Sequence, residues 1–417
     1  MEAGKMRVLL ISEFYPPKIS GIAQHVRRLA LNLAKRGHEI QVLVSDPSHK
    51  AVENEENVEV VRTKHILSSF KWIFTDKEMC YVPPLPDFVL KKGIMKVIAA
   101  FGPDIVHVHG WPMYTVAALK KRFPRLPIIS TFHDYGFFCP KQTSYNENER
   151  SICYQREPLV FRCVSCARNS HGLMKSFAIM SSMLAFRKLL GNLDQIVAVS
   201  DYLRNVTIEA GFNNVRVIPN FIDLNEMKKI EKTCFGNEGS FLTDILYVGA
   251  LVPYKGVHVL LKAYKTLKNN LNFLPQLTLV GRSHLKWSFN ISDSKVKMIS
   301  NMPSDIVFSY MQHAKIVVVP SVWPEASSLV TLEAMTFKKP VIASAIGSLR
   351  EFVQDRETGL LVPPNDHLEL ASAIKYLLEK PQRMKHMGIE GYNRVVKLFS
   401  AEKVVPQIED LYKEVGE

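Results

Sequence analysis

The residues from Lys315 to Ser344 read "KIVVVPSVWPEASSLVTLEAMTFKKPVIAS", and they contain two apolar runs separated by a segment of helical length. The runs at 315–320 and 340–344 predict two strands, because short apolar runs bounded by proline and polar residues are typical of buried strands. Two strands that are joined through a helix and lie in one sheet run parallel. The stretch therefore predicts a β-α-β unit.

The same alternation of apolar runs and amphipathic segments extends over nearly all of the 417 residues. The predicted strands before Asn220 lie at 6–12, 39–44, 58–62, 104–109, 127–133, 195–200 and 215–220. The predicted strands after Asn220 lie at 244–250, 276–281, 296–300, 315–320, 340–344 and 359–363. Apolar strands that alternate with helices indicate parallel sheets covered on both faces, so the predicted fold class is α/β with two doubly wound domains.

The two series of strands meet near the sequence "NFIDLNEMKK". We expect an N-terminal domain over 1–221 with a cysteine-rich insert at 139–166, and a C-terminal domain over 222–398. The last residues, 399–417, predict a helix that returns to the N-terminal domain.

Composition narrows the possible partners and the location. With 47% hydrophobic and 22% charged residues, the chain has the composition of a folded globular protein. The 53 Lys and Arg against 40 Asp and Glu give a formal charge of +13, which favours anionic partners such as nucleotides or an acidic membrane surface. The first apolar run is too short for a signal peptide, and no run reaches the roughly 18 apolar residues that span a bilayer. We expect a cytoplasmic protein, at most peripheral on the inner membrane face.

Two glutamates in the opening stretch, Glu325 and Glu333, flank a predicted helix start that Ser327 or Ser328 can cap. Free N–H groups at a helix start suit a diphosphate, which carboxylates would repel. Carboxylates do accept hydrogen bonds from the paired hydroxyls of sugars. The pattern therefore predicts a ligand with a sugar on each side of its phosphates, as in a nucleotide sugar.

Cations for such a phosphate follow two other predicted strands. Lys255 and Gly256 come after the strand at 244–250, and Arg282 follows the strand at 276–281. Each charge alone is compatible with an ordinary solvated residue. Because ligands of open α/β sheets bind beyond the carboxyl ends of the strands, these side chains are expected to converge on one anion.

The first strand end lacks the G-x-G-x-x-G pattern of dinucleotide-binding proteins, which argues against a nicotinamide-dependent dehydrogenase. Gly21 either lets the backbone approach a ligand or only eases the turn into the following helix. His133 ends the strand at 127–133, where it could donate a hydrogen bond to a substrate hydroxyl or have a purely structural role. His107 and His109 are weaker candidates for the same site.

Eight motifs lie along nearly the whole length of the chain: "YPPKISGIAQHVRRLALNLAKRGHEIQVL", "HDYGFFCP", "IVAVSDYL", "VRVIPNFID", "YVGALVPYKG", "WPEASSLVTLEAM", "KPVIAS" and "ETGLLVPPND". In these motifs together the chain resembles the GT-B glycosyltransferases of the large retaining family 4. The resemblance implies two Rossmann-like domains that face a central cleft. It also implies transfer of a hexose, with retention, from a UDP- or GDP-linked sugar to a glycan or lipid-linked acceptor, without a catalytic metal or other cofactor.

The resemblance also implies roles for single residues. His133 matches a histidine near the transferred sugar, and Lys255 matches the phosphate-binding lysine. Glu325 and Glu333 match the E-x7-E pair, on the sugar and on the nucleotide ribose. The predicted catalytic residues are His133, Glu325 and Lys255. The predicted donor-binding residues are Gly21, Lys255, Arg282, Glu325, Ser327, Ser328, Leu329 and Glu333.

Three positions depart from the family pattern. Ala250 stands where an arginine completes the phosphate site, Ser20 replaces the first glycine of the N-terminal loop, and Ser327-Ser328 replace a Phe-Gly pair. Arg282 could substitute for the missing arginine. The alternatives are a catalytically inactive protein that binds sugar nucleotides, or a GT-B sugar-nucleotide epimerase. Nucleic acid is not an expected partner, because aromatic residues do not interleave with the basic ones.

Four of the six cysteines cluster in one segment, at Cys139, Cys153, Cys163 and Cys166. The single C-x2-C pair with two further cysteines is compatible with a structural zinc site, with thiols that bind nothing, or with disulfides.

The segment 171–192, "HGLMKSFAIMSSMLAFRKLLGN", is apolar with basic ends. It could rest on an anionic membrane. Its apolar residues occupy most of the helix circumference, which favours a core helix instead.

Overall fold

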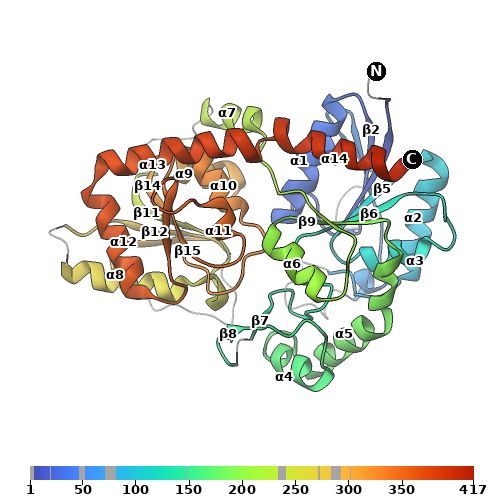
Figure 1. The fold of residues 1–417 in the computed structure, drawn as a ribbon, viewed down its shortest axis with the longest axis horizontal. Helices are drawn as coiled ribbons and strands as arrows, with labels where there is room; N and C mark the ends of the chain where they lie inside the picture. Colours follow the sequence, from blue (N-terminus) through green and yellow to red (C-terminus); the bar gives the residue numbers. More distant parts are fainter. Residues whose placement is uncertain are drawn as a thin grey trace. The chain divides into compact units, whose positions relative to one another are not determined.

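The computed structural model describes residues 4–18, 20–46, 52–70, 81–146, 148–232, 241–270, 273–282, 293–300 and 302–417. Contacts divide the chain into two compact units. Unit 1 contains Met1–Glu149, Cys153–Pro219 and Val405–Glu417, and unit 2 contains Arg150–Ile152 and Asn220–Val404. Each unit is built on one large sheet with helices packed against it (Figure 1).

The sheet of unit 1 has the strand order β10-β9-β6-β5-β1-β2-β4-β3. Its strands are β1 (Arg7–Ser12), β2 (Glu39–Val44), β3 (Val52–Glu55), β4 (Val58–Arg62), β5 (Ile105–His109), β6 (Ile128–Phe132), β9 (Gln195–Ala198) and β10 (Val215–Val217). All neighbours are parallel except β3 and β4. The edge strand β3, "VENE", was not predicted, because its polar residues lack the apolar run of a buried strand.

The helices of unit 1 begin at polar caps. Ser20, Asp87 and Ser200 each accept a hydrogen bond from a backbone N–H in the first turn of the helix that follows. The helices are α1 (Gly21–Lys35), α2 (Phe88–Phe101), α3 (Met113–Leu119), α4 (Val160–His171), α5 (Leu173–Phe186) and α6 (Asp201–Glu209). Two short strands, β7 (Tyr145–Asn146) and β8 (Ser151–Ile152), precede α4.

The sheet of unit 2 is parallel throughout, with the strand order β13-β12-β11-β14-β15-β16. Its strands are β11 (Thr243–Val248), β12 (Leu277–Val280), β13 (Val296–Ile299), β14 (Ala314–Val319), β15 (Val341–Ser344) and β16 (Gly359–Val362). Its helices are α7 (Leu224–Lys232), α8 (Val257–Asn270), α9 (Ser304–His313), α10 (Leu329–Thr336), α11 (Leu349–Phe352), α12 (His367–Glu379) and α13 (Pro381–Arg394).

The predicted β-α-β unit at 315–344 is confirmed. Strands β14 and β15 pair in parallel, with Val317 opposite Val341, and α10 connects them. The last four residues of β14 and all four residues of β15 are buried. Because strands buried on both faces need no polar positions, their sequences form uninterrupted apolar runs.

The last helix, α14 (Ala401–Gly416), ends in unit 1. Glu409 lies 2.6 Å from Arg36 Nη2 and 2.9 Å from His38 Nε2. The Tyr412 hydroxyl lies 2.7 Å from Nδ1 of His107. These contacts attach the C-terminal residues to the unit that contains β1.

The strand orders fix where a ligand can bind in each unit. In unit 2, β11 lies between β12 and β14, so the direction of the chain through the sheet reverses there. In unit 1, β1 lies between β5 and β2, with the same consequence. Ligands of open α/β sheets bind beyond the carboxyl ends of the strands at such a reversal. The loops after β11 and β14, and after β1 and β5, are therefore the expected ligand-binding positions.

The segment 171–192 was expected to form a core helix. This prediction is wrong for one face of α5, which is exposed. Met180 and Met183 are buried against Val164 of α4. Met174, however, is 86% exposed, and Leu173 and Phe177 are exposed as well. The apolar residues surround α5 as predicted, but the neighbouring helix covers only part of the circumference. No helix among the described residues is both long and apolar enough to cross a membrane.

Candidate active site

In unit 2 the loops after β11 and β14 bring Lys255 and Glu325 into an ion pair. Lys255 ends the short 3₁₀ turn Pro253–Lys255 that precedes α8. Its Nζ lies 2.8 Å and 3.0 Å from the two carboxylate oxygens of Glu325. The hydroxyl of Ser321 donates to the same carboxylate at 2.6 Å, and Nζ also lies 4.7 Å from the ring centroid of Trp323. The predicted cation and carboxylate thus lie together at the carboxyl edge of the sheet.

Two glycines let these loops approach each other closely. Gly256 has a φ of 77°, and a Cβ there would lie 1.7 Å from the carbonyl oxygen of Pro320. A Cβ on Gly347 would lie 2.5 Å from the carbonyl oxygen of Glu325, and the N–H of Ser348 donates to that oxygen at 2.9 Å. The backbone on both sides of the ion pair is therefore fixed by contacts that only glycine permits.

Replacing Gly256 by alanine is expected to lower the thermal unfolding midpoint well beyond the effect of a left-handed backbone alone. Gly211 supplies the matched control, because its φ is 89° and a Cβ there would meet nothing within 4 Å. We expect Gly211→Ala to cost about 1 kcal/mol, and Gly256→Ala about 3 kcal/mol or more, since Pro320 must also move. Equal midpoints for the two variants would contradict the close approach of the loops.

The start of α10 is formed as the sequence predicted. Ser328 is the N-cap, and its Oγ accepts from the N–H of Thr331 at 3.4 Å. The hydroxyl of Ser327 accepts from the side-chain amide of Asn220 at 2.9 Å. Leu329 is the first residue of the helix, and Glu333 is buried one turn further on. Their roles toward a donor stay predictions.

Arg282 follows β12 with an exposed side chain. Its carbonyl oxygen accepts from the N–H of Leu251 at 2.9 Å, next to Ala250, whose carbonyl accepts from the hydroxyl of Tyr247 at 2.7 Å. Backbone hydrogen bonds thus join the loop after β11 to the loop after β12. Whether the Arg282 guanidinium replaces the missing arginine side chain stays a prediction.

In unit 1 three histidines converge beyond the sheet edge. His109 ends β5, His133 follows β6, and His25 lies on α1. One ligand atom from each of them lies within 4.8 Å of the others, and Nδ1 of His109 is 2.9 Å from Nε2 of His133. The hydrogen bond requires one of these two nitrogens to donate and the other to accept. The hydrogen bond with His109 therefore orients the ring of His133, and the ring of His25 packs against it at a centroid distance of 4.9 Å.

Burial keeps these imidazoles neutral. It lowers the pKa of His133 and of His107 to about 3, and it lowers the pKa of His25 and of His109 well below the usual value. Neighbouring imidazoles add to the effect at His25, His107 and His109. Three neutral imidazoles could also hold a metal ion, since zinc accepts three histidines and one water. Nε2 of His109 is buried and has no hydrogen-bond partner among the described residues.

The stability of unit 1 is expected to fall as the pH drops from about 6.5 towards 3. The folded state keeps His107 neutral in this window while the unfolded chain protonates it, so the unfolded state binds more protons. Each such histidine contributes up to about 1.4 kcal/mol per pH unit. We expect His107→Gln to flatten the dependence of the unfolding midpoint on pH, and His386→Gln, at an exposed histidine, to leave it unchanged. A slope identical to that of the wild type in His107→Gln would contradict the assignment.

Two buried acids at the same edge of unit 1 were not predicted. Glu13 follows β1 and accepts from the N–H of Val82 at 2.8 Å, and burial raises its pKa to about 8. Asp134 accepts from the N–H of Gly136 at 2.7 Å, and burial raises its pKa to about 6. Glu13 could have been found, because it is the first residue after an apolar strand.

Other members of the site were not singled out from the sequence. Ser321, Trp323 and Asn220 belong to the site only through their contacts with Glu325, Lys255 and Ser327. Gly21 begins α1 directly after its cap, Ser20, and its approach to a ligand stays a prediction.

Comparison with known proteins identifies the family. The model described as Glycosyl transferases group 1 matches residues 240–394, and the model described as Glycosyltransferase Family 4 matches residues 19–226. An uncharacterized glycosyltransferase of Methanocaldococcus jannaschii is 28% identical over 415 residues, which cover 99% of each chain.

Solved structures agree on the fold. A sucrose-phosphate synthase from Thermosynechococcus elongatus matches with a TM-score of 0.70 and 21% identity over 99% of each chain. The Anabaena protein HepE in complex with UDP-glucose matches with a TM-score of 0.63 and 17% identity, over 98% of this chain and 100% of that one. The chain described above is therefore a GT-B glycosyltransferase of the family 4 type.

Proposed function

We propose that this enzyme transfers a hexose, with retention of the anomeric configuration, from a UDP- or GDP-linked sugar to a glycan or lipid-linked acceptor. The observation that carries the proposal is the ion pair of Lys255 and Glu325 at the strand reversal of unit 2, with distances of 2.8 Å and 3.0 Å. The pair offers a cation for a diphosphate beside a carboxylate for sugar hydroxyls.

The surroundings of the pair suit such a donor. The α10 N-terminus, capped by Ser328, adds backbone N–H groups and a positive dipole end. Two buried polar atoms nearby, Oδ1 of Asn220 and Oγ of Ser348, have no hydrogen-bond partner within the described parts of the chain. Buried polar groups of this kind are normally satisfied, so a hydroxyl-rich ligand is a suitable partner. We assign Glu325 to the transferred sugar and Glu333 to the ribose.

Among the residues of unit 2, Lys255 is proposed to contribute most to catalysis. Negative charge develops on the diphosphate as the sugar departs, and a fixed cation that faces this charge lowers the barrier. Gly21 and Arg282 are the further proposed phosphate contacts. The UDP-glucose bound by HepE supports a uridine donor.

His133 is proposed to hydrogen-bond a hydroxyl of the transferred sugar. Its neutral ring offers one donor or acceptor beyond the contact with His109. A neutral imidazole can hold a hydroxyl without adding positive charge beside the anomeric carbon, where positive charge develops.

The donor is tested with a panel of UDP- and GDP-sugars and a set of glycan and lipid-linked acceptors. We expect acceptor-dependent release of nucleoside diphosphate with one donor, and a product whose anomeric configuration, measured by NMR, equals that of the donor. An inverted product would contradict retention. Ala250 stands where the family pattern has an arginine, and this difference favours one alternative, an inactive protein that binds sugar nucleotides. Donor binding measured by calorimetry, without any release of nucleoside diphosphate, would support that alternative.

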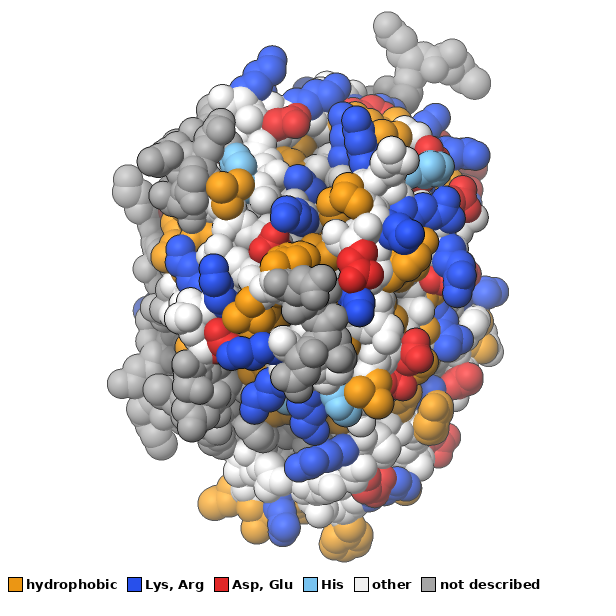
Figure 2. Space-filling view, turned by 90° about the vertical axis from the view of Figure 1, so that its left-hand side faces the viewer, with side chains coloured by type: hydrophobic (Ala, Val, Ile, Leu, Met, Phe, Trp, Pro, Cys, Tyr) orange, Lys and Arg blue, Asp and Glu red, His pale blue; other side chains and the backbone are white. Residues whose placement is uncertain are grey.

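We also propose that helices α4 and α5 contact an anionic membrane surface. Phe161 on α4 is 91% exposed, and Leu173, Met174 and Phe177 are exposed at neighbouring positions of α5. The basic residues Arg162, Arg168 and Lys188 are exposed on or next to the same helices. Figure 2 shows apolar side chains beside basic ones at its lower end, the height at which Figure 1 places α4 and α5. Apolar side chains rimmed by basic ones are typical of surfaces that bind anionic membranes.

The double variant Met174→Ser, Phe177→Ser is expected to bind phosphatidylglycerol vesicles at least about tenfold more weakly than the wild type, because it removes the apolar contacts. Flotation at low and at high salt measures the binding. Leu368→Ser, which removes an exposed apolar residue of unit 2, is the control and is expected to float like the wild type. Wild-type protein that does not float with these vesicles at low salt would contradict the contact.

A further inference from the structure

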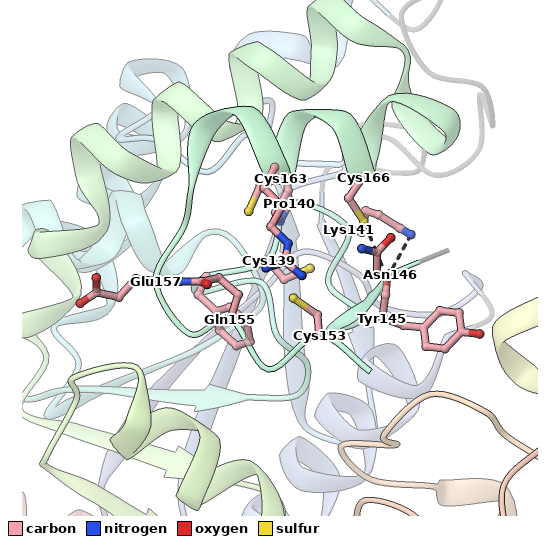
Figure 3. Close-up of a pocket in the computed structure, with 12 residues that line it drawn as sticks. Cys139, Pro140, Lys141, Tyr145, Asn146, Cys153, Gln155, Glu157, Cys163 and Cys166 are labelled. Atoms are coloured by element: carbon pink, nitrogen blue, oxygen red, sulfur yellow. Dashed lines mark hydrogen bonds between the residues drawn. The ribbon is translucent and has the colours of Figure 1, made fainter. Parts of the chain in front are cut away.

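Four cysteines that the transfer reaction does not use line a single pocket in unit 1. The pocket has a volume of about 30 Å³, and Cys139, Cys153, Cys163 and Cys166 contribute to its lining. Figure 3 shows Cys163 and Cys166 on one stretch of α4, with Cys139 and Cys153 on the loops next to it. None of the four forms a disulfide. A pocket of this size holds little more than one water molecule or one ion.

The spacing of the two helical cysteines places them on one face. Residues three apart on a helix are neighbours, so Cys163 and Cys166 both face the pocket.

Backbone N–H groups surround the sulfur of Cys139. Those of Ser144, Lys141 and Thr143 hydrogen-bond to it. The turn that directs these groups inward has Gln142 at a φ of 61° and Ser144 at a φ of 50°. Hydrogen bonds from backbone N–H groups favour the charged form of the sulfur, which is the form that binds metals.

Cys153 is fixed by the same loop. Its N–H donates to the carbonyl oxygen of Ser144 at 2.8 Å, and the Ser144 hydroxyl donates to its carbonyl oxygen at 2.9 Å. Arg156 Nη1 donates to that oxygen at 2.9 Å as well. Two of the four sulfur positions are therefore set by one hydrogen-bonded loop, and the other two by a helix.

The helical pair α4 and α5 has a small core of its own. The buried cluster there consists of Val164, Met180 and Met183. Very small domains with little buried apolar surface usually gain stability from a disulfide or a metal ion. A cross-link between α4 and the loop at 139–153 would supply that stability.

We propose that Cys139, Cys153, Cys163 and Cys166 bind a structural zinc ion that joins α4 to the loop at 139–153. Four thiolates complete a tetrahedral zinc site and leave no open position for substrate, which distinguishes it from a catalytic metal site. Lys141 and Arg162 also line the pocket and offset the negative charge of such a site.

Zinc binding requires the sulfur atoms to move closer together. At Zn–S distances of about 2.3 Å they lie about 3.8 Å apart. Among the described residues, the group whose ligand atoms already lie within 4.8 Å of one another is His25, His109 and His133. On binding the metal, the thiols lose their protons.

The metal content of the purified full-length protein, measured by mass spectrometry after growth with zinc and purification without chelators, tests the site. We expect about one zinc per chain in the wild type, and less than a tenth of that in Cys153→Ser and in Cys163→Ser. Cys234→Ser removes a cysteine outside the segment and is expected to retain the zinc. The wild type loaded with Co²⁺ is expected to show the charge-transfer and d–d absorption of a tetrahedral thiolate site, a readout that needs no variant.

Three results would overturn the proposal. The first is wild-type protein without zinc and without the Co²⁺ bands. The second is zinc that persists in both cysteine variants and is lost in His109→Gln, which would place the metal among the histidines. The third is a thiol count on denatured, unreduced protein that falls short by two or four, which would show disulfides instead.

Discussion

Lys255→Ala is expected to lower kcat/KM for sugar transfer by about 10²–10³-fold, the usual effect of removing one group that stabilises developing negative charge. The lysine is held at 2.8 Å from Glu325 and over the ring of Trp323, so its ammonium is fixed before the reaction begins. Water that fills the space left by the lysine side chain carries no fixed positive charge and therefore cannot replace it. Steady-state rates of nucleoside diphosphate release measure the loss.

Two controls separate the charge from its position. Lys255→Arg keeps the charge but changes its geometry, and it is expected to recover only part of the activity. Lys262→Ala removes an exposed lysine from the helix that follows Lys255, and it is expected to react like the wild type. Equal losses in Lys255→Ala and Lys262→Ala would mean that only the net charge of the unit matters.

Glu325→Ala is expected to lower kcat/KM by a similar factor and also to destabilise unit 2 by about 1–3 kcal/mol. The carboxylate is buried and accepts from Lys255 and from Ser321, so truncation leaves both donors without this acceptor. We expect no larger loss of stability, because the Lys255 side chain is about one quarter exposed and solvent screens its interaction with Glu325. Thermal unfolding and initial rates measure the two effects separately.

The double variant Lys255→Ala, Glu325→Ala tests whether the two residues act as a unit. We expect its loss of activity to be much smaller than the product of the single losses, because either truncation disables the same pair. Glu379→Ala, at an exposed glutamate of α12, is the matched control and is expected to change neither rate nor stability. Fully multiplicative losses would contradict the coupling.

Much of the fold follows from the sequence because parallel strands are buried on both faces. The run that forms β14 is apolar at every position except Lys315, and the helices between such strands are amphipathic. The edge strand β3 escaped the prediction because half of its residues are exposed. The exposed face of α5 escaped because periodicity shows where apolar residues lie on a helix, but not which of them another element covers.

The site could be predicted where motif and strand end coincide. Lys255, Glu325 and His133 all follow strands, as does Glu13, which carries no motif and was missed. The contacts of Ser321 and Trp323 with the ion pair depend on how two distant loops pack, and Gly256 permits that packing only in the folded chain. Such pairings leave no trace in local sequence.

We propose that Lys255 and Glu325 hold a nucleotide sugar whose hexose the enzyme transfers. The initial rate of acceptor-dependent nucleoside diphosphate release from the best UDP- or GDP-sugar, compared among wild type, Lys255→Ala and Glu325→Ala, tests this role most directly. We expect release by the wild type and rates at least about 100-fold lower in both variants. Release at the same rate in all three proteins would rule the role out.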